Sequence, residues 1–210
     1  RKSLIPMKEW KYLNKDYIES LKKTFRTLED KRDELMQLGR TINKNSKTII
    51  YSLIRDDWEE AEKYIEENRK LVKQLFEEVT KNYPQYYNNA FIPLQEYVEA
   101  EVVYHYLKEG RIPTHEELGI PEEAYVTGLM DAAGELLRKA VEEMIKDNLD
   151  FAIRIREILE EIYLAMLSLN FKNFDYRKKV DYVGGVLNRL IDYIFQKQTR
   201  RGGDFKGENN

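Results

Sequence analysis

The sequence predicts an all-α protein of about seven helices, and three observations support this fold class. Apolar residues recur at spacings of three, four and seven over long segments, which is the period of one face of an α-helix. Only 10 Gly and 5 Pro interrupt 210 residues that are rich in Lys, Glu, Leu and Ile, a composition that favours helices. No useful length of sequence alternates apolar and polar residues with the period of two typical of strands.

The expected helices follow one another with short connections. Periodicity predicts long helices at 17–55, 58–81, 85–108, 122–146, 149–169 and 175–198. Asp56 or Asp57 is suited to cap the second of them. The connection RIPTHEELGIPEEA (111–124) is expected to contain one short helical turn, because Thr114 and Glu117 form a capping pattern.

This organisation predicts one elongated antiparallel helical bundle that spans residues 1–201 as a single domain. The following tail, GGDFKGENN (202–210), has the composition of a disordered segment. No apolar run approaches the roughly 18 residues that a membrane span requires, and the N-terminal residues show no signal-peptide pattern. We therefore expect a cytoplasmic protein without a membrane partner.

Several classes of chemistry are excluded by composition. The chain contains no cysteine, which rules out disulfides, thiolate metal sites and thiol catalysis. The only two histidines, His105 and His115, are too few for a three-histidine zinc site. There is no Glu-x-x-His pair, P-loop, GxGxxG, HExxH or nucleophile elbow.

Charge is distributed unevenly along the chain, although the net charge is only −3. Residues 1–56 carry 14 Lys and Arg against 8 Asp and Glu, and residues 176–210 carry 8 against 4. Residues 57–110 carry 6 against 12, and residues 111–175 carry 7 against 14. A fold that joins the two ends would place a basic surface beside an acidic one; scattered, solvated helix faces are the simpler interpretation.

The segment LQEYVEAE (94–101) places two carboxylates on an apolar stripe. At 100° per residue, Glu99 lies about 60° from Glu96, and both share a face with Val103. Glu101 lies about 140° away from Glu96, on a different side of the helix. Carboxylates on an apolar stripe are costly unless a positive charge compensates them. The pair is therefore either bound to a Lys or Arg at the rim, or part of a metal or catalytic site.

A second pair, Asp131 and Glu135, lies four residues apart and hence on one helix face. Periodicity places this pair on a solvated stripe with Thr127 and Arg138, away from the apolar face. Together, the two pairs offer four oxygen ligands, and Mg²⁺ prefers oxygen and needs no histidine. Such an ion polarises a phosphodiester and activates a bound water.

Four segments resemble the translin family, in order and over nearly the whole chain from about residue 17 to 202. They are KRDELMQLGRTINKNSKTIIYSLIR (31–55), FIPLQEYVEAEVVYHYLKEG (91–110), TGLMDAAGELLRKAV (127–141) and DYRKKVDYVGGVLNRLIDYIFQKQTRRG (175–202). The second and third are similar to the branch of translin-associated factor X (Trax), and the short, Lys/Glu-rich chain resembles its prokaryotic, archaeal members. Translin itself lacks the carboxylate pair at the QEYVE position.

The resemblance implies an all-helical fold whose subunits assemble with themselves into a closed hollow shell, like a hexamer or octamer. It also implies Mg²⁺-dependent, or Mn²⁺-dependent, endonuclease action on single-stranded RNA. The catalytic and metal-binding acids of the Trax branch fall on Glu96, Glu99, Asp131 and Glu135.

The first hypothesis is accordingly a metal-dependent endoribonuclease whose basic ends bind the backbone of single-stranded RNA or single-stranded DNA. The candidate phosphate-binding residues, each of which is alternatively a solvated surface charge, are Lys22, Lys23, Arg26, Arg32, Arg40, Lys47, Arg177, Lys178, Lys179, Arg200 and Arg201. Tyr97, Tyr104 and Tyr106 are candidates for base stacking or for core packing. The alternatives are a non-catalytic nucleic-acid-binding shell and a structural bundle without a nucleic-acid role.

Overall fold

The computed structural model describes the backbone of residues 10–204 and the side chains of residues 10–200. Within these residues the chain is all-α and contains no strand, as predicted. The helices are α1 (Lys15–Ile54), α2 (Trp58–Glu77), α3 (Phe91–Glu109), the single turn α4 (His115–Leu118), α5 (Glu122–Ile145), α6 (Leu149–Ser168) and α7 (Phe174–Asp204). The domain end predicted at residue 201 falls inside α7, and residues 205–210 of the predicted tail lie outside the described residues.

Two short elements replace the end of the helix predicted at 58–81 and the start of the helix predicted at 85–108. The π-helical turn η1 (Glu78–Asn82) follows α2, and the 3₁₀ helix η2 (Pro84–Ala90) precedes α3. The hydroxyl of Thr80 donates to the carbonyl of Phe76 at 2.6 Å, and this bond competes with the regular backbone bond at that carbonyl. Pro93 is tolerated because it lies in the first turn of α3, where amide groups have no helical partner.

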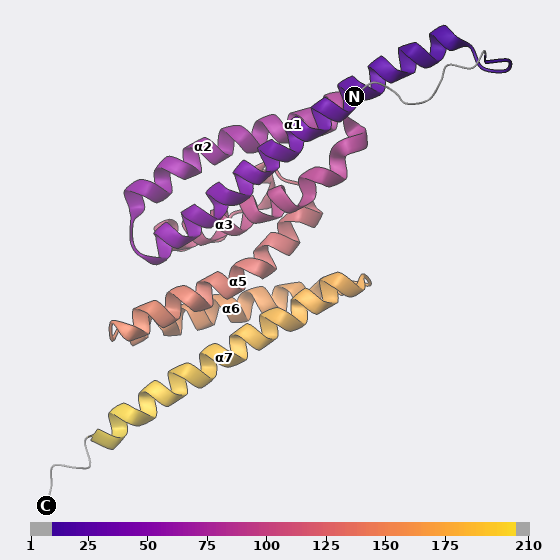
Figure 1. Cartoon of the computed structure of the whole chain (residues 1–210). Helices are drawn as coiled ribbons and strands as arrows, with labels where there is room; N and C mark the ends of the chain where they lie inside the picture. The colour runs from indigo at the N-terminus through magenta and orange to yellow at the C-terminus, as the bar shows by residue number, and fades with distance from the viewer. Residues whose placement is uncertain (1–9, 205–210) are drawn as a thin grey trace, which may run out of the picture.

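The helices pack in two groups that share the α3–α5 contact. Figure 1 shows α1, α2 and α3 on one side, α6 and α7 on the other, and α5 between α3 and the second group. The core is centred on the facing sides of α3 and α5, where Val98, Val103, Ala133 and Leu136 are completely buried.

Gly128 allows α5 to approach α3 closely. A Cβ at this position would lie 2.6 Å from the Cβ of Val98 and 2.7 Å from the carbonyl oxygen of Gln95, both on α3. Any side chain at residue 128 would therefore move the two helices apart. The distance between the carboxylate-bearing faces of α3 and α5 depends on this glycine.

A buried lysine fixes α5 against the turn between α1 and α2. Lys139 is 3% exposed, and its Nζ donates to the carbonyl of Ile54 at 3.0 Å and to Asp56 Oδ1 at 2.8 Å. Glu143 Oε1 lies 3.2 Å from the same Nζ. This contact sets the position of the C-terminal end of α1 relative to α5.

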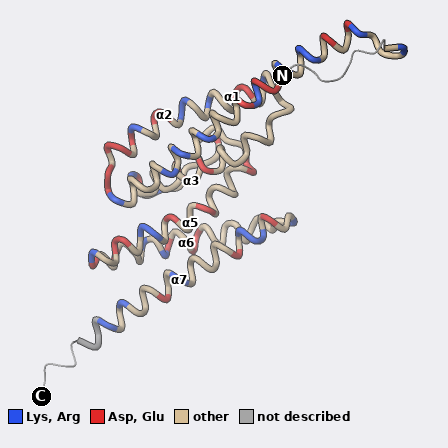
Figure 2. Tube along the Cα trace, in the orientation of Figure 1, with Lys and Arg blue, Asp and Glu red and all other residues tan. Residues whose placement is uncertain are grey.

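The two basic ends of the chain do not meet within one subunit. Figure 1 shows the N-terminal part of α1 and the C-terminal part of α7 projecting from opposite ends of the molecule. Lys and Arg residues occur along both projecting parts (Figure 2). No helix in the described part of the chain has both the length and the hydropathy needed to cross a membrane.

Candidate active site

Helices α3 and α5 bring the four candidate carboxylates into one electrostatic cluster. Glu96 and Glu99 come from α3, Asp131 and Glu135 come from α5, and all four are partly buried. We refer to these four residues as the carboxylate cluster. The expectation that Asp131 and Glu135 lie on a solvated stripe of α5 is therefore wrong, because both are partly buried. Thr127 on the same stripe is only 2% exposed.

Burial and mutual repulsion act on the two glutamates of α3. Burial, followed by the negative charges of Glu96, Glu135 and Asp131, raises the pKa of Glu99 to about 8. Burial also raises the pKa of Glu96, while the positive charge of Lys47 acts in the opposite direction. The cluster thus holds more negative charge than its surroundings neutralise.

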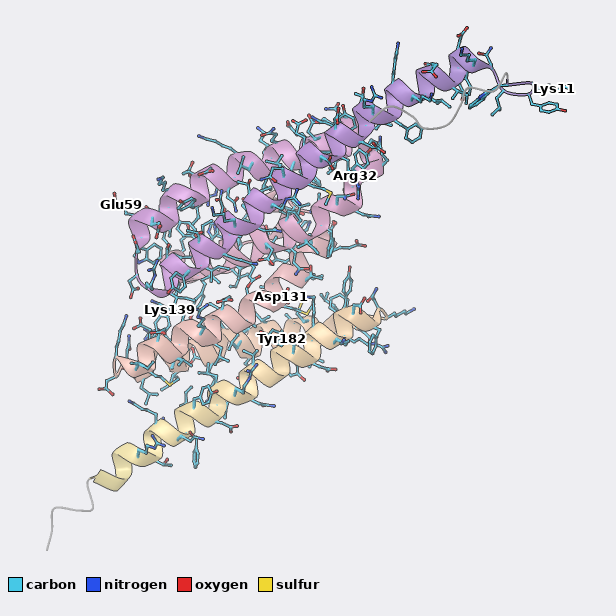
Figure 3. All side chains as sticks on the ribbon, viewed as in Figure 1. Lys11, Arg32, Glu59, Asp131, Lys139 and Tyr182 are labelled. Carbon is cyan, nitrogen blue, oxygen red and sulfur yellow. The ribbon has the colours of Figure 1, made fainter. Side chains whose placement is uncertain are left out.

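Asp131 is the compensated member of the carboxylate cluster. Lys179 Nζ, from α7, donates to both carboxylate oxygens of Asp131 at 2.7 Å and 2.8 Å. Gln95 Nε2, from α3, donates to Asp131 Oδ2 at 2.6 Å. Figure 3 labels Asp131 beside Tyr182 of α7, which shows how closely α7 covers this part of α5.

Glu135 has a buried oxygen without a hydrogen-bond donor among the described residues. Its Oε2 is inaccessible and accepts no hydrogen bond, and Arg138 Nη1 is 3.7 Å away. At the neighbouring Gly134, a Cβ would clash with the hydroxyl oxygen of Tyr182, so the absence of a side chain gives room for the tip of this tyrosine over α5. Burial and the charge of Asp131 raise the pKa of Tyr182.

An open groove of about 760 Å³ gives access to the cluster. Its acidic lining residues are Glu96, Glu99 and Glu135, together with Glu60 of α2. Its basic and aromatic lining residues are Lys47, Tyr51, Arg55 and Arg138, and Arg55 lies near Glu60 and Arg138 near Glu135. Three helices and the end of α1 therefore create one groove that holds both an excess of carboxylates and a row of cations.

The donor set fits a hard divalent cation in chemistry and in charge. Carboxylate oxygens are the ligands of Mg²⁺ and Mn²⁺, and the buried oxygen of Glu135 requires a positive partner. Among the described residues, no three His, Asp or Glu side chains converge as ligands of one metal ion. This does not conflict with a Mg²⁺ site, because Mg²⁺ keeps several waters and is held by one or two carboxylates.

The predicted phosphate-binding residues are distributed over two distant surfaces. Lys22, Lys23, Arg26, Arg32, Arg40, Lys47, Arg177, Lys178 and Arg200 are exposed, Lys179 is partly buried, and the side chain of Arg201 lies outside the described residues. Only Lys47 and Lys179 of this set interact with the carboxylate cluster. Lys22 is paired with Glu19 at 2.7 Å.

The three candidate stacking tyrosines belong to the interior rather than to the groove. Tyr97 and Tyr104 are 5% and 7% exposed, and Tyr106 is partly buried. The Tyr104 hydroxyl donates to Glu62 Oε1 at 3.2 Å. Core packing is therefore their observed role in this subunit.

Sequence reasoning did not single out Tyr51, Arg55 and Arg138, although a signal was present. Lys47, Tyr51 and Arg55 are spaced by four, and this spacing places them on one face of α1 and its C-terminal end. Arg138 follows Glu135 by three residues on α5 and shares its face. The spacing of four between Lys47, Tyr51 and Arg55 is thus the signal that could have identified this part of the groove lining.

Comparisons with known proteins agree with this architecture. The sequence model of the Translin family matches residues 30–192. An uncharacterized protein of Methanocaldococcus jannaschii is 32% identical over 167 residues, which cover 75% of this chain and 72% of that protein. The crystal structure of apo-NeC3PO is 45% identical and covers 90% of this chain and 100% of its own, with a TM-score of 0.84.

Two further solved structures share the fold. The crystal structure of AfC3PO is 25% identical, with a TM-score of 0.78, and covers 88% of this chain and 98% of its own. The structure of a complex of AfC3PO with duplex RNA is 24% identical, with a TM-score of 0.77 and the same coverage. The arrangement of α1, α2, α3 and α5 that builds the groove thus belongs to a fold that other proteins have.

Proposed function

This chain belongs to the translin family, and from that premise we propose that it is a Mg²⁺-dependent endoribonuclease that cleaves single-stranded RNA. The observation that carries this proposal is the carboxylate cluster, in which burial and three neighbouring carboxylates raise the pKa of Glu99 to about 8. Such a concentration of acidic groups costs stability, and a function that requires a bound cation would explain why the protein has it.

Glu96, Glu99, Asp131 and Glu135 would hold the ion, Mg²⁺ or Mn²⁺. When bound, the ion polarises the phosphodiester and stabilises the charge that develops in the transition state. A carboxylate of the cluster accepts the proton of the attacking water, and the partly buried position of the cluster strengthens these interactions. Lys47 and Lys179 place positive charge beside the phosphate.

RNA as the ligand is supported by relatives as well as by charge. A structure of AfC3PO in complex with duplex RNA has been solved. In this chain, Lys and Arg residues occur along α1 and α7 (Figure 2), where they are suited to follow a phosphate backbone. Single-stranded RNA is the proposed substrate, single-stranded DNA is a further candidate ligand, and duplex RNA is a necessary arm of every binding experiment.

Self-association into a hexamer- or octamer-like shell completes the proposal. Large apolar side chains remain exposed on α6 and α7, where solvent contact is unfavourable; they are Leu164, Leu167, Leu169, Phe174, Tyr182, Ile191, Tyr193 and Phe195. Light scattering coupled to size exclusion measures the assembly mass. A monomer at micromolar concentration would contradict this part of the proposal.

One specific observation favours the alternative, a non-catalytic RNA-binding protein. Lys179 already neutralises Asp131 through two short bonds, as a structural cation would. A binding-only protein would bind RNA without cleaving it in Mg²⁺ or in Mn²⁺.

The deciding experiment measures cleavage of labelled single-stranded RNA in Mg²⁺, in Mn²⁺ and in chelator. We expect cleavage only with metal, and a loss of about 10³-fold or more in Glu96→Ala and in Asp131→Ala, since removal of charge stabilisation in the transition state has effects of this size. Glu142→Ala, an exposed acid on α5, is the matched control. Cleavage that persists in chelator, or in both site variants, would rule out the carboxylate mechanism.

A further inference from the structure

The groove contains two arginines that have no role in the proposed reaction. Arg55 lies at the C-terminal end of α1, Arg138 lies on α5, and both reach the ring of Tyr51. The guanidinium carbon of Arg55 is 4.1 Å from the ring centroid, and that of Arg138 is 5.6 Å from it. Two cations thus share one aromatic ring in the groove that contains the carboxylates.

This arrangement concentrates like charge at an accessible position. The side chains of Arg55 and Arg138 are 51% and 52% exposed, and Tyr51 is 48% exposed. Two guanidinium groups repel each other, and the negative face of the ring and nearby carboxylates offset that repulsion. An anion between the two arginines would stabilise the arrangement more directly.

The existing ion pairs of the two arginines are long. Arg55 Nη2 is 3.6 Å from Glu60 Oε2, and Arg138 Nη1 is 3.7 Å from Glu135 Oε2. Both distances exceed hydrogen-bond length. Among the described residues, neither guanidinium has a hydrogen-bonded partner, so the N–H groups of both face solvent or a ligand.

The chemistry of guanidinium selects the ligand. Its planar fork matches two oxygens of a phosphate, and it is more weakly hydrated than an ammonium group. A polyanion that approaches Glu96, Glu99 and Glu135 would be repelled without compensating cations nearby. Arg55 and Arg138 supply such cations within the same groove.

We infer that Arg55 and Arg138, held in place by Tyr51, bind phosphates of the RNA strand in the groove. These phosphates are adjacent to the phosphate that reaches the carboxylate cluster. The inference rests on the proposed function, because it assumes that an RNA strand enters the groove. Tyr51 acts as a positioning residue and not as a base platform, since the Arg55 guanidinium occupies one face of its ring. Arg55 and Arg138 are the residues that contact the substrate.

The experiment measures the affinity of a fluorescein-labelled oligouridylate by fluorescence anisotropy, in chelator, across about 50–200 mM salt. Chelator separates binding from cleavage. The variants are Arg55→Gln, Arg138→Gln, Arg55→Lys, Tyr51→Phe and Tyr51→Leu. The matched control is Arg154→Gln on α6, because Arg154 is an exposed arginine 5.8 Å from the ring of Phe151 and lies outside the groove.

We expect Arg55→Gln and Arg138→Gln each to weaken binding about tenfold, as the loss of one charge-assisted contact does. Each should reduce the salt slope by about 0.7, the value for one phosphate contact with a single strand. Arg55→Lys should keep the slope and recover part of the affinity. Tyr51→Leu should weaken binding about threefold at an unchanged slope, whereas Tyr51→Phe and Arg154→Gln should bind as the wild type does.

The possible failures are distinguishable. A purely structural stack would lower the melting temperature of Arg55→Gln and Arg138→Gln without changing the salt slope, and that result would overturn the inference. Wild-type binding by both variants together with normal cleavage would overturn the inference alone. Binding with the expected slopes but no cleavage in Mg²⁺ or Mn²⁺ would overturn the nuclease proposal alone. A wild type that binds no RNA would overturn both.

Discussion

Two glutamates of α3, only two residues apart, occupy opposite electrostatic situations. Glu101 is 1% exposed, and it accepts two hydrogen bonds from Arg69 of α2, at 2.7 Å to Nε and 3.0 Å to Nη2. His105 Nε2 lies 3.2 Å from Glu101 Oε2, the oxygen that also accepts from Arg69 Nη2. Glu99 instead faces three carboxylates, and its pKa is raised to about 8.

The difference teaches that depth of burial does not identify a functional acid. Glu101 is the more deeply buried of the two, yet a bidentate guanidinium compensates it, and these hydrogen bonds raise the pKa of Arg69. Such a pair ties α2 to α3 and has a structural role. The carboxylate cluster contains more acids than nearby cations can neutralise, and this imbalance is what makes it a candidate for metal binding.

The largest expected effect comes from breaking the structural pair. Glu101→Gln should lower the free energy of unfolding by about 3 kcal/mol, the lower end of the range for a broken buried ion pair, because Arg69 remains 38% exposed. Urea unfolding monitored by circular dichroism measures this loss. The same change at Glu99 should cost less than about 1 kcal/mol at neutral pH without metal, because Gln resembles the protonated carboxyl that the raised pKa favours.

A double substitution sharpens the comparison. Glu101→Leu together with Arg69→Met should be closer to wild-type stability than Glu101→Leu alone, since the double variant leaves no unpaired buried charge. Equal losses for Glu101→Gln and Glu99→Gln would contradict the distinction between the structural pair and the carboxylate cluster.

The second effect concerns the contact that holds α3 and α5 together. Gly128→Ala should cost about 2–3 kcal/mol, because its Cβ would lie 2.6 Å from that of Val98 and 2.7 Å from a backbone oxygen. It should also reduce the rise in melting temperature that Mg²⁺ produces, since the carboxylate pairs move apart.

Gly185→Ala on α7 is the matched control, because a Cβ there meets nothing within 4 Å. It should stabilise the helix by up to about 1 kcal/mol. If Gly128→Ala retained full stability, the close approach of α3 to α5 would not be required.

The third effect is a pH dependence that only one of the two glutamates produces. The folded pKa of Glu99, about 8, exceeds its ordinary value of 4.5, so the folded state binds more protons than the unfolded state between these pH values. The contribution of Glu99 to stability is therefore complete below about pH 4.5 and is lost as the pH rises to about 8. In chelator, Glu99→Gln should remove this decline and melt about 3–6 °C above the wild type near pH 9.

Added Mg²⁺ should reverse that order, because the wild type gains stability by binding the ion and the variant loses one of its ligands. Melting curves over a pH series, with and without Mg²⁺, measure both effects. Identical pH profiles for the two proteins would show that folding does not raise the pKa of Glu99.

The fold was predictable because the period of 3.6 is local. Apolar spacing located the six long helices, but it did not reveal η1 and η2, where Thr80 bonds to the carbonyl of Phe76 and Pro84 begins a 3₁₀ helix. The α3 carboxylates stood out for the same reason, since they lie on an apolar stripe.

The surroundings of each carboxylate were not predictable from one helix. The α5 stripe reads as solvated because its own sequence does not reveal that Lys179 and Tyr182 of α7 cover it. Glu101 was correctly placed on another face, but its burial depends on Arg69, which lies 32 residues earlier. The basic lining of the groove depends on α1 and α5 packing together through Lys139.

The smallest expected effect concerns Lys179, the cation that forms an ion pair with Asp131 of the carboxylate cluster. Lys179 donates to both oxygens of Asp131, so it competes with a metal ion for this carboxylate. Lys179→Met should increase the apparent affinity for Mg²⁺ about fivefold, as the removal of roughly 1 kcal/mol of competing charge would do. Calorimetric titration without RNA measures this change. Lys178→Met, which removes an exposed neighbouring charge, should leave the affinity unchanged. Weaker Mg²⁺ binding by Lys179→Met would instead show that Lys179 orients Asp131 for the metal ion. The contrast with the Glu101–Arg69 pair would then apply only to Glu96, Glu99 and Glu135.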